Sequence, residues 1–242
     1  MYRALLTAFL VSLSAPALAQ ENAAPAAASA LTQEQIAAFN QAVADFNAAQ
    51  QAQQANDNAT AATRYAAALP AIREAVKAQP GNIDNVTFLA NALYADAAAN
   101  LALQKTEEGV ALLEESLPHW RAVVQAKPAE TANKKLLASV ATQVANMKLS
   151  KQDKAGAAPL YAEALTLARG LASAQPDAAN RNLLLSALIG ASQTSEDAAV
   201  KAEAVSLSKT MLADGSVDAV NKPAAEVLGG AAAAAQTPAP AS

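Results

Sequence analysis

Three arginines recur at intervals of 48 residues: Arg73, Arg121 and Arg169, with Lys209 as a weaker fourth member of the series. A guanidinium presents paired donors in a planar fork, so a row of them on one face could grip the carboxylates of a ligand. The alternative is that each is a solvated cation in the C-terminal half of a helix, where the helix dipole favours positive charge. We favour this second interpretation from the sequence.

His119 and Trp120 are the only histidine and the only tryptophan of the chain, and there is no cysteine. One imidazole without thiolates predicts no zinc or copper site. Trp120 shares its register with Ile72 and Ala168, so we expect it to be a core contact.

The sequence contains few patterns typical of catalysis. Ser206-Leu207-Ser208-Lys209 matches the S-x-x-K string of penicillin-binding serine enzymes, but nothing like their S-D-N or K-T-G elements follows. No G-x-G-x-x-G, phosphate-binding loop or H-E-x-x-H occurs. We therefore predict no enzyme activity, no cofactor and no metal. An enzyme acting on peptidoglycan or a metabolite would need perturbed carboxylates clustered in a pocket.

The first residues have the form of a secretory signal peptide. Met1-Tyr2-Arg3 is a short cationic start, Ala4–Leu13 is apolar but too short to span a bilayer, and Ala17-Leu18-Ala19 suits a signal peptidase. The pattern predicts cleavage between Ala19 and Gln20 and a periplasmic or secreted protein. No later segment is long and apolar enough to cross a membrane, so we expect no stable membrane insertion after cleavage.

The charge balance is mildly acidic. The chain has 17 Lys and Arg against 21 Asp and Glu, a net charge of −4, which becomes −5 once Arg3 is removed with the signal peptide. Nucleic-acid affinity comes largely from cations that neutralise phosphates. The balance therefore argues against a nucleic-acid partner.

A twelve-residue phrase returns at the same interval of 48 and indicates what positions these side chains. It reads LPAIREAVKAQP at Leu69–Pro80, LPHWRAVVQAKP at Leu117–Pro128 and LTLARGLASAQP at Leu165–Pro176. Equal spacing predicts structural units stacked on one another. Apolar residues at helical spacing, polar turns and a terminal Pro predict an all-α fold of stacked antiparallel helical hairpins.

The boundaries of the units follow from this pattern. We expect a signal peptide at 1–19, a disordered leader at 20–30, helical repeats at 31–228 and a flexible tail at 229–242. The repeat units end near 80, 128 and 176, with a degenerate one near 216. Thr32 and Gln35 form a predicted capping box. Pro70 and Pro118 predict bends in otherwise continuous helices, and Asn221–Leu228 a short final helix.

The helices resemble the second helix of tetratricopeptide repeats, which carries a small residue, a bulky one four later, another small one, and then a Pro. Ala68, Ile72 and Ala75 before Pro80 match this pattern. The corresponding residues of the next copies are Ser116, Trp120 and Val123 before Pro128, and Ala164, Ala168 and Leu171 before Pro176. The likeness spans roughly Ala59 to Ser216. A unit of 48 instead of about 34 residues, without the Trp-Leu-Gly-Tyr signature, marks a long-helix relative.

This resemblance implies a curved stack whose first helices line a groove that holds peptides or protein segments. In that family, Asn and basic side chains near the start of groove-lining helices hold a peptide backbone and its terminal carboxylate. The residues in such places here are Asn85, Asn133, Lys134, Asn180 and Arg181. Local capping explains the asparagines equally well.

Two functions therefore remain open from the sequence. The first is an exported scaffold that binds a protein or peptide partner in the cell envelope. The alternative is a self-associating spacer without a peptide ligand, which packs through alanine-rich faces and exposed apolar positions.

Overall fold

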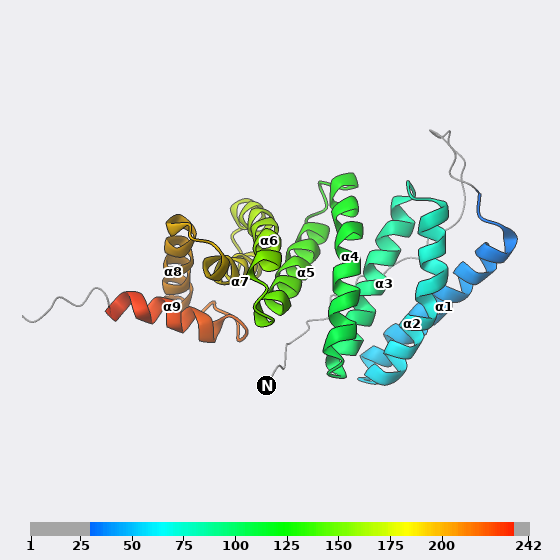
Figure 1. Ribbon diagram of the computed structural model, residues 1–242, viewed down its shortest axis with the longest axis horizontal. Helices are drawn as coiled ribbons and strands as arrows, with labels where there is room; N and C mark the ends of the chain where they lie inside the picture. Colours follow the sequence, from blue (N-terminus) through cyan, green and yellow to red (C-terminus); the bar gives the residue numbers. More distant parts are fainter. Residues whose placement is uncertain (1–29, 235–242) are drawn as a thin grey trace, which may run out of the picture. The chain divides into compact units, whose positions relative to one another are not determined.

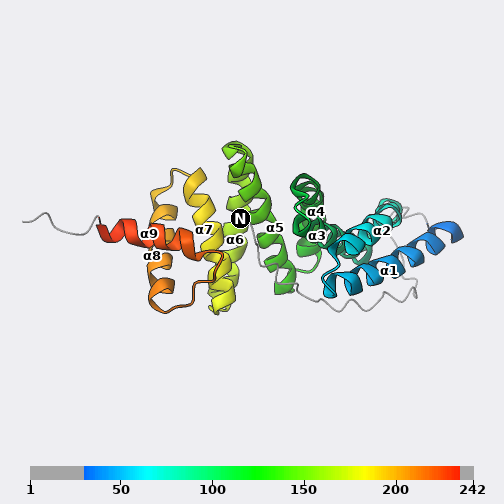
Figure 2. The ribbon, with the colours of Figure 1, turned by 90° about the horizontal axis from the view of Figure 1, so that it is seen from below.

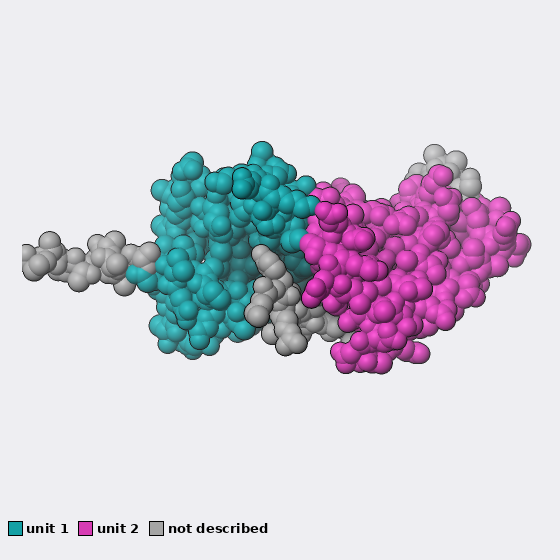
Figure 3. Space-filling model, turned by 60° about the horizontal axis from the view of Figure 1, so that its bottom comes forward, with its two compact units in different colours: residues 1–5, 129–242 teal, residues 6–128 magenta. Residues whose placement is uncertain are grey.

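The computed structural model describes residues 30–234, and all of their regular structure is α-helical. No strand occurs within this range, which confirms the all-α prediction. The predicted signal peptide, the leader up to residue 29 and tail residues 235–242 lie outside the described residues. The described helices fall into two compact units, an N-terminal unit of residues 30–128 and a C-terminal unit of residues 129–234 (Figure 3).

The N-terminal unit consists of two antiparallel helical hairpins in which each helix packs on the next one along the chain (Figure 1). Its helices are α1 (Gln33–Gln54), α2 (Asn58–Ala78), α3 (Ile83–Ala102) and α4 (Thr106–Ala126). The predicted capping box opens α1: the Thr32 amide donates to Gln35 Oε1 at 2.9 Å, and the Gln35 amide donates to Thr32 Oγ1 at 3.2 Å.

The C-terminal unit contains two further hairpins and a final helix. Its helices are α5 (Thr131–Ser150), α6 (Lys154–Ala174), α7 (Ala178–Thr194), α8 (Ala198–Ala213) and α9 (Lys222–Ala234). Besides consecutive pairs, α5 packs on α7, as expected when one hairpin stacks on the next. α9 lies across α8 (Figures 1 and 2). It continues beyond Leu228, where we expected the repeats to end, because the alanines after Gly229-Gly230 are strong helix formers.

The repeat is preserved in the helices themselves. α2, α4 and α6 each have 21 residues and begin 48 residues apart. α2 and α4 run without a break through Pro70 and Pro118. All nine residues that carry the tetratricopeptide resemblance are buried: Ala68, Ile72, Ala75, Ser116, Trp120, Val123, Ala164, Ala168 and Leu171.

The turn inside each of the first three hairpins has one shared geometry that the sequence did not reveal. Asn56, Gln104 and Gln152 have φ values of 62°, 62° and 63° and stand 48 residues apart. In each turn the next amide donates to a carbonyl five residues back; the Lys105 amide, for example, reaches the Asn100 oxygen at 2.9 Å. A left-handed residue followed by such a bond is a Schellman motif, in which glycine is the usual residue.

The two units fill their cores differently. Phe46 of the N-terminal unit meets the Phe88 ring at 5.1 Å and the Tyr65 ring at 5.3 Å between centroids, and Phe39 meets Phe88 at 5.7 Å. In the C-terminal unit, Tyr161 is the one aromatic residue. Leucine, methionine and alanine fill the rest of that core.

Candidate functional site

The recurring arginines are engaged in ion pairs between helices. Arg73 of α2 donates from Nε and Nη2 to the two carboxylate oxygens of Glu115 in α4, at 2.7 and 2.8 Å. Arg169 of α6 pairs in the same way with Glu203 of α8. These hydrogen bonds raise the pKa of both arginines above the usual value. Arg121 is not free either. The arginines therefore connect the second helices of successive hairpins, and neither of our sequence interpretations described this role.

The three asparagines of the predicted binding set are buried and hold local partners. Asn85 is 5% exposed, and its side-chain amide donates to Gln79 Oε1 at 3.3 Å. Asn133 is 8% exposed and donates to Glu130 Oε2 at 2.7 Å. These contacts tie the first turn of α3 and of α5 to the loop before it.

Asn180 follows the same scheme at the start of α7. Its backbone amide donates to the N-cap residue Asp177, and its side-chain amide donates to the Gln175 carbonyl at 2.7 Å. Its side-chain oxygen is buried without a hydrogen-bond partner among the described residues. A role of the three asparagines in holding a peptide remains a prediction, and their burial keeps the amides away from the surface.

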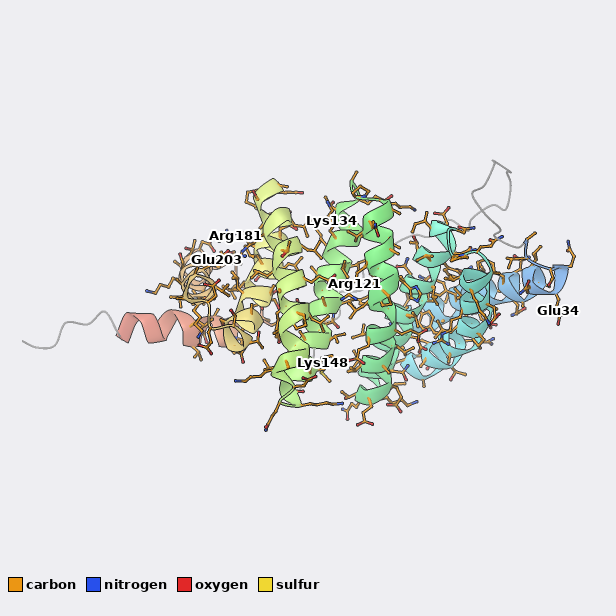
Figure 4. The ribbon with its side chains drawn as sticks, turned by 45° about the horizontal axis from the view of Figure 1, so that its top comes forward. Glu34, Arg121, Lys134, Lys148, Arg181 and Glu203 are labelled. Carbon is orange, nitrogen blue, oxygen red and sulfur yellow. The ribbon has the colours of Figure 1, made fainter. Side chains whose placement is uncertain are left out.

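The two basic residues of the predicted set lie in the C-terminal unit and are both half-buried. Lys134 belongs to α5 and Arg181 to α7 (Figure 4). Arg181 Nη2 lies 2.7 Å from Asp214 Oδ2, at the end of α8. Of the five predicted residues, Arg181 is the one that leads to an open cavity.

This cavity lies between α7 and α8 and has a volume of about 270 Å³. It is lined by Leu184 of α7 and by Glu203, Ser206, Leu207 and Thr210 of α8. The four α8 residues share one face, because residues three, four and seven apart in a helix project on the same side. We call this cavity, with its lining residues, the α7–α8 hollow.

An ion pair bounds each end of the hollow. Arg181 stands one turn before Leu184, and its partner Asp214 stands one turn after Thr210, so their pair closes one end. A hydrogen bond from Ser216, followed by that from Arg181, lowers the pKa of Asp214 to about 2. Glu203 at the other end is occupied by Arg169. Arg181 and Glu203 project from neighbouring helices on the same side of this unit (Figure 4).

The hollow suits binding more than bond-breaking chemistry. Its two leucines offer apolar contact, and the Thr210 hydroxyl donates to the Ser206 carbonyl within the same helix. Its one carboxylate is held by an arginine. Within residues 30–234, no group of three or more His, Asp or Glu side chains could hold a metal ion.

A buried carboxylate in the N-terminal unit is the most perturbed acid of the described chain, and sequence reasoning missed it. Asp96 of α3 is 3% exposed and accepts from Asn100 Nδ2 at 2.7 Å. Burial raises the pKa of Asp96 to about 6, against smaller opposing effects of Asn100 and Arg73. The available signal was an acid in the register of Leu89 and Leu93. Its burial closes it to a substrate, so we assign it no catalytic role.

The members of the hollow were also missed by sequence reasoning, except for Arg181. Their signal is the spacing of Glu203, Ser206, Leu207 and Thr210 on one helical face, inside the degenerate repeat. The S-x-x-K string that covers part of this face drew attention to its serines for another reason.

Comparison with protein-family models gives no match, and no curated protein is similar enough to the chain to be a relative.

Proposed function

We propose that this protein is an exported helical-repeat scaffold that binds a protein or peptide segment in the cell envelope. The signal-peptide pattern of residues 1–19 supports export. The buried register of the tetratricopeptide-like residues supports a repeat of the peptide-binding kind. No helix within residues 30–234 is long and apolar enough to cross a membrane.

The observation that carries the binding proposal is the α7–α8 hollow. A volume of about 270 Å³ is at the lower limit of small-molecule pockets, which range from about 300 to 1,000 Å³. It fits one bulky apolar side chain of a partner segment against Leu184 and Leu207. The ion pairs of Arg181 and Glu203 at its two ends would favour a segment with polar residues on either side of that anchor.

Site-specific photo-crosslinking in the producing cells tests this proposal. A photo-reactive amino acid at Leu207 should yield a discrete covalent adduct with another protein, whereas the same group at Ala202, exposed on α8 outside the lining, should not. The Leu207→Gln variant should lower capture from a second crosslinking position in the hollow roughly tenfold, because it removes one apolar contact. Absence of an adduct at Leu207, or equal adducts at Ala202, would refute the proposal.

Cell fractionation tests the export part separately. The protein should occur in the periplasmic or secreted fraction, and N-terminal sequencing should begin at Gln20. The alternative function, a self-associating spacer without a peptide ligand, predicts a mass that rises with concentration while Leu207 gives no adduct.

A further inference from the structure

The outward face of α9 and the turn before it carry the large apolar side chains that are most exposed in the described chain. Val220 is 61% exposed and Val227 is 69% exposed. They are seven residues apart, so they lie on the same side of the helix. Pro223 and Gly230 on that side are also exposed, and neither has a long polar side chain to cover the valines.

The opposite side of α9 is firmly held, so this exposure is not a consequence of loose packing. Ala225 is fully buried in a cluster with Leu185 and Met211. A Cβ at Gly229 would lie 3.1 Å from Leu212 Cδ1 of α8. Two hydrogen bonds anchor the turn: the Asp218 amide donates to Asn182 Oδ1 at 2.9 Å, and Asn221 Nδ2 donates to the Asn182 carbonyl at 3.0 Å.

The charges on one flank of α9 are arranged symmetrically about the apolar positions. Lys222 and Glu226 are 60% and 56% exposed, and their charged atoms are 4.0 Å apart. The midpoint of this pair is Ala224, and the midpoint of Val220 and Val227 lies half a residue before it. An antiparallel copy of the same helix therefore meets it with valine opposite valine and lysine opposite glutamate.

We infer that this face, defined by Val220, Pro223, Val227 and Gly230 with Lys222 and Glu226 on its flank, is a two-fold interface with α9 of a second copy of the chain. In such an isologous contact each residue meets its complement twice. Small residues between the valines allow the two helix axes to approach closely. The inference is independent of the proposed peptide binding, because the α7–α8 hollow uses other residues.

The interface is small, so the dimer should be weak. Contacts below the standard size of roughly 1,200–2,000 Å² belong to transient encounters. We expect a Kd on the order of 100 µM for the full chain, measured by sedimentation velocity over a concentration series. The Val227→Asp variant should weaken association at least tenfold. The same change at an exposed residue of α1, Ala44→Asp, should leave it unchanged.

Charge reversal tests the antiparallel arrangement itself. Lys222→Glu and Glu226→Lys should each weaken self-association, because each places like charges opposite one another in both halves of the contact. An equimolar mixture of the two variants should recover a one-to-one dimer. Circular dichroism of each variant checks that α9 and the unit remain folded.

Each other result overturns the inference. A wild-type chain that stays monomeric through the series leaves the valine face to a different protein. A dimer unaffected by Val227→Asp uses another surface, and a mixture that does not associate rules out the lysine–glutamate register. None of these results bears on a crosslink at Leu207, so the two proposals fail separately.

Discussion

The N-terminal and C-terminal units are built from the same repeat, yet only the first packs it around aromatic rings. Phe39, Phe46, Tyr65 and Phe88 form a connected set with centroid distances of 5.1 to 5.7 Å. Residues 129–242 contain Tyr161 as their one aromatic residue. A helical repeat can thus keep its period while the volume of its core side chains changes greatly.

Helix length changes together with the core. The N-terminal helices have 20 to 22 residues, whereas α7 has 17 and α8 has 16. The hollow lies between these two short helices, where leucines and small polar residues face one another. We infer that the degenerate repeat gave up packing volume where a binding surface could form, while the aromatic repeats supply stability.

Removal of one ring should have the largest effect on this contrast. Phe46→Ala should lower the free energy of unfolding by about 3–5 kcal/mol, because Phe46 is 2% exposed and contacts two other rings. Denaturant unfolding measures the loss, and hydrogen exchange should show it mainly in α1, α2 and α3. Val43→Ala, at a half-buried position of the same helix, should cost less than half as much. Equal losses would contradict a core centred on the aromatic set.

The second prediction tests the tightest contact of the C-terminal unit. A Cβ at Gly190 of α7 would lie 2.0 Å from Tyr161 Cε1, so Gly190→Ala should destabilise by about 1–3 kcal/mol. The Tyr161 ring cannot move freely, because its hydroxyl donates to Asn146 Oδ1 at 2.6 Å. Gly170→Ala is the matched control: nothing lies within 4 Å of its Cβ position, so the better helix former should add about 0.5–1 kcal/mol. Stabilisation by both changes would mean that α6 and α7 are not closely packed there.

The repeat shows how much of this fold can be read from the sequence. The 48-residue phrase predicted the period, the helix class and the buried register, because apolar spacing and proline act locally. Thr32 and Gln35 likewise formed the expected capping box. The positive φ of Gln104 and Gln152 was not foreseen, since glutamine has no particular preference for that conformation.

The candidate site was much less predictable than the fold. Arg73 and Glu115 are 42 residues apart, and nothing in either segment alone indicates that they meet. The hollow depends on how far α7 and α8 approach one another, which is a property of packing. Recurrence of Asn85, Asn133 and Asn180 was visible, but the local partners that bury their amides were not.

The third prediction concerns the charge buried in the N-terminal unit. Burial raises the pKa of Asp96 from 3.8 to about 6, so between these values the folded protein binds more protons than the unfolded chain. Stability should therefore fall as the pH rises from about 4 to about 6 and remain lower above that. Asp96→Asn removes this loss and should stabilise the protein by about 1–2 kcal/mol at pH 7.5, with little gain at pH 4.

Denaturant unfolding at the two pH values checks this expectation. Glu34→Gln, at an exposed position of α1, controls for the removal of one negative charge and should change stability by less than about 0.5 kcal/mol. An Asp96→Asn variant that is less stable than the wild type at pH 7.5 would mean that the carboxylate is a favourable partner of Arg73.

The smallest expected effect concerns the left-handed turns that both units share. Gln104→Gly should raise the free energy of unfolding by about 0.5–1 kcal/mol, because φ of 62° strains a residue with a Cβ and suits glycine. Asn56→Gly in the equivalent turn should gain less, since asparagine already tolerates this conformation. The hydrogen bond from the next amide is present in both turns, from Lys105 to Asn100 and from Asp57 to Ala52, so it cannot account for a difference. Equal gains at the two positions in thermal unfolding would show that the turn, and not the residue type within it, sets the strain.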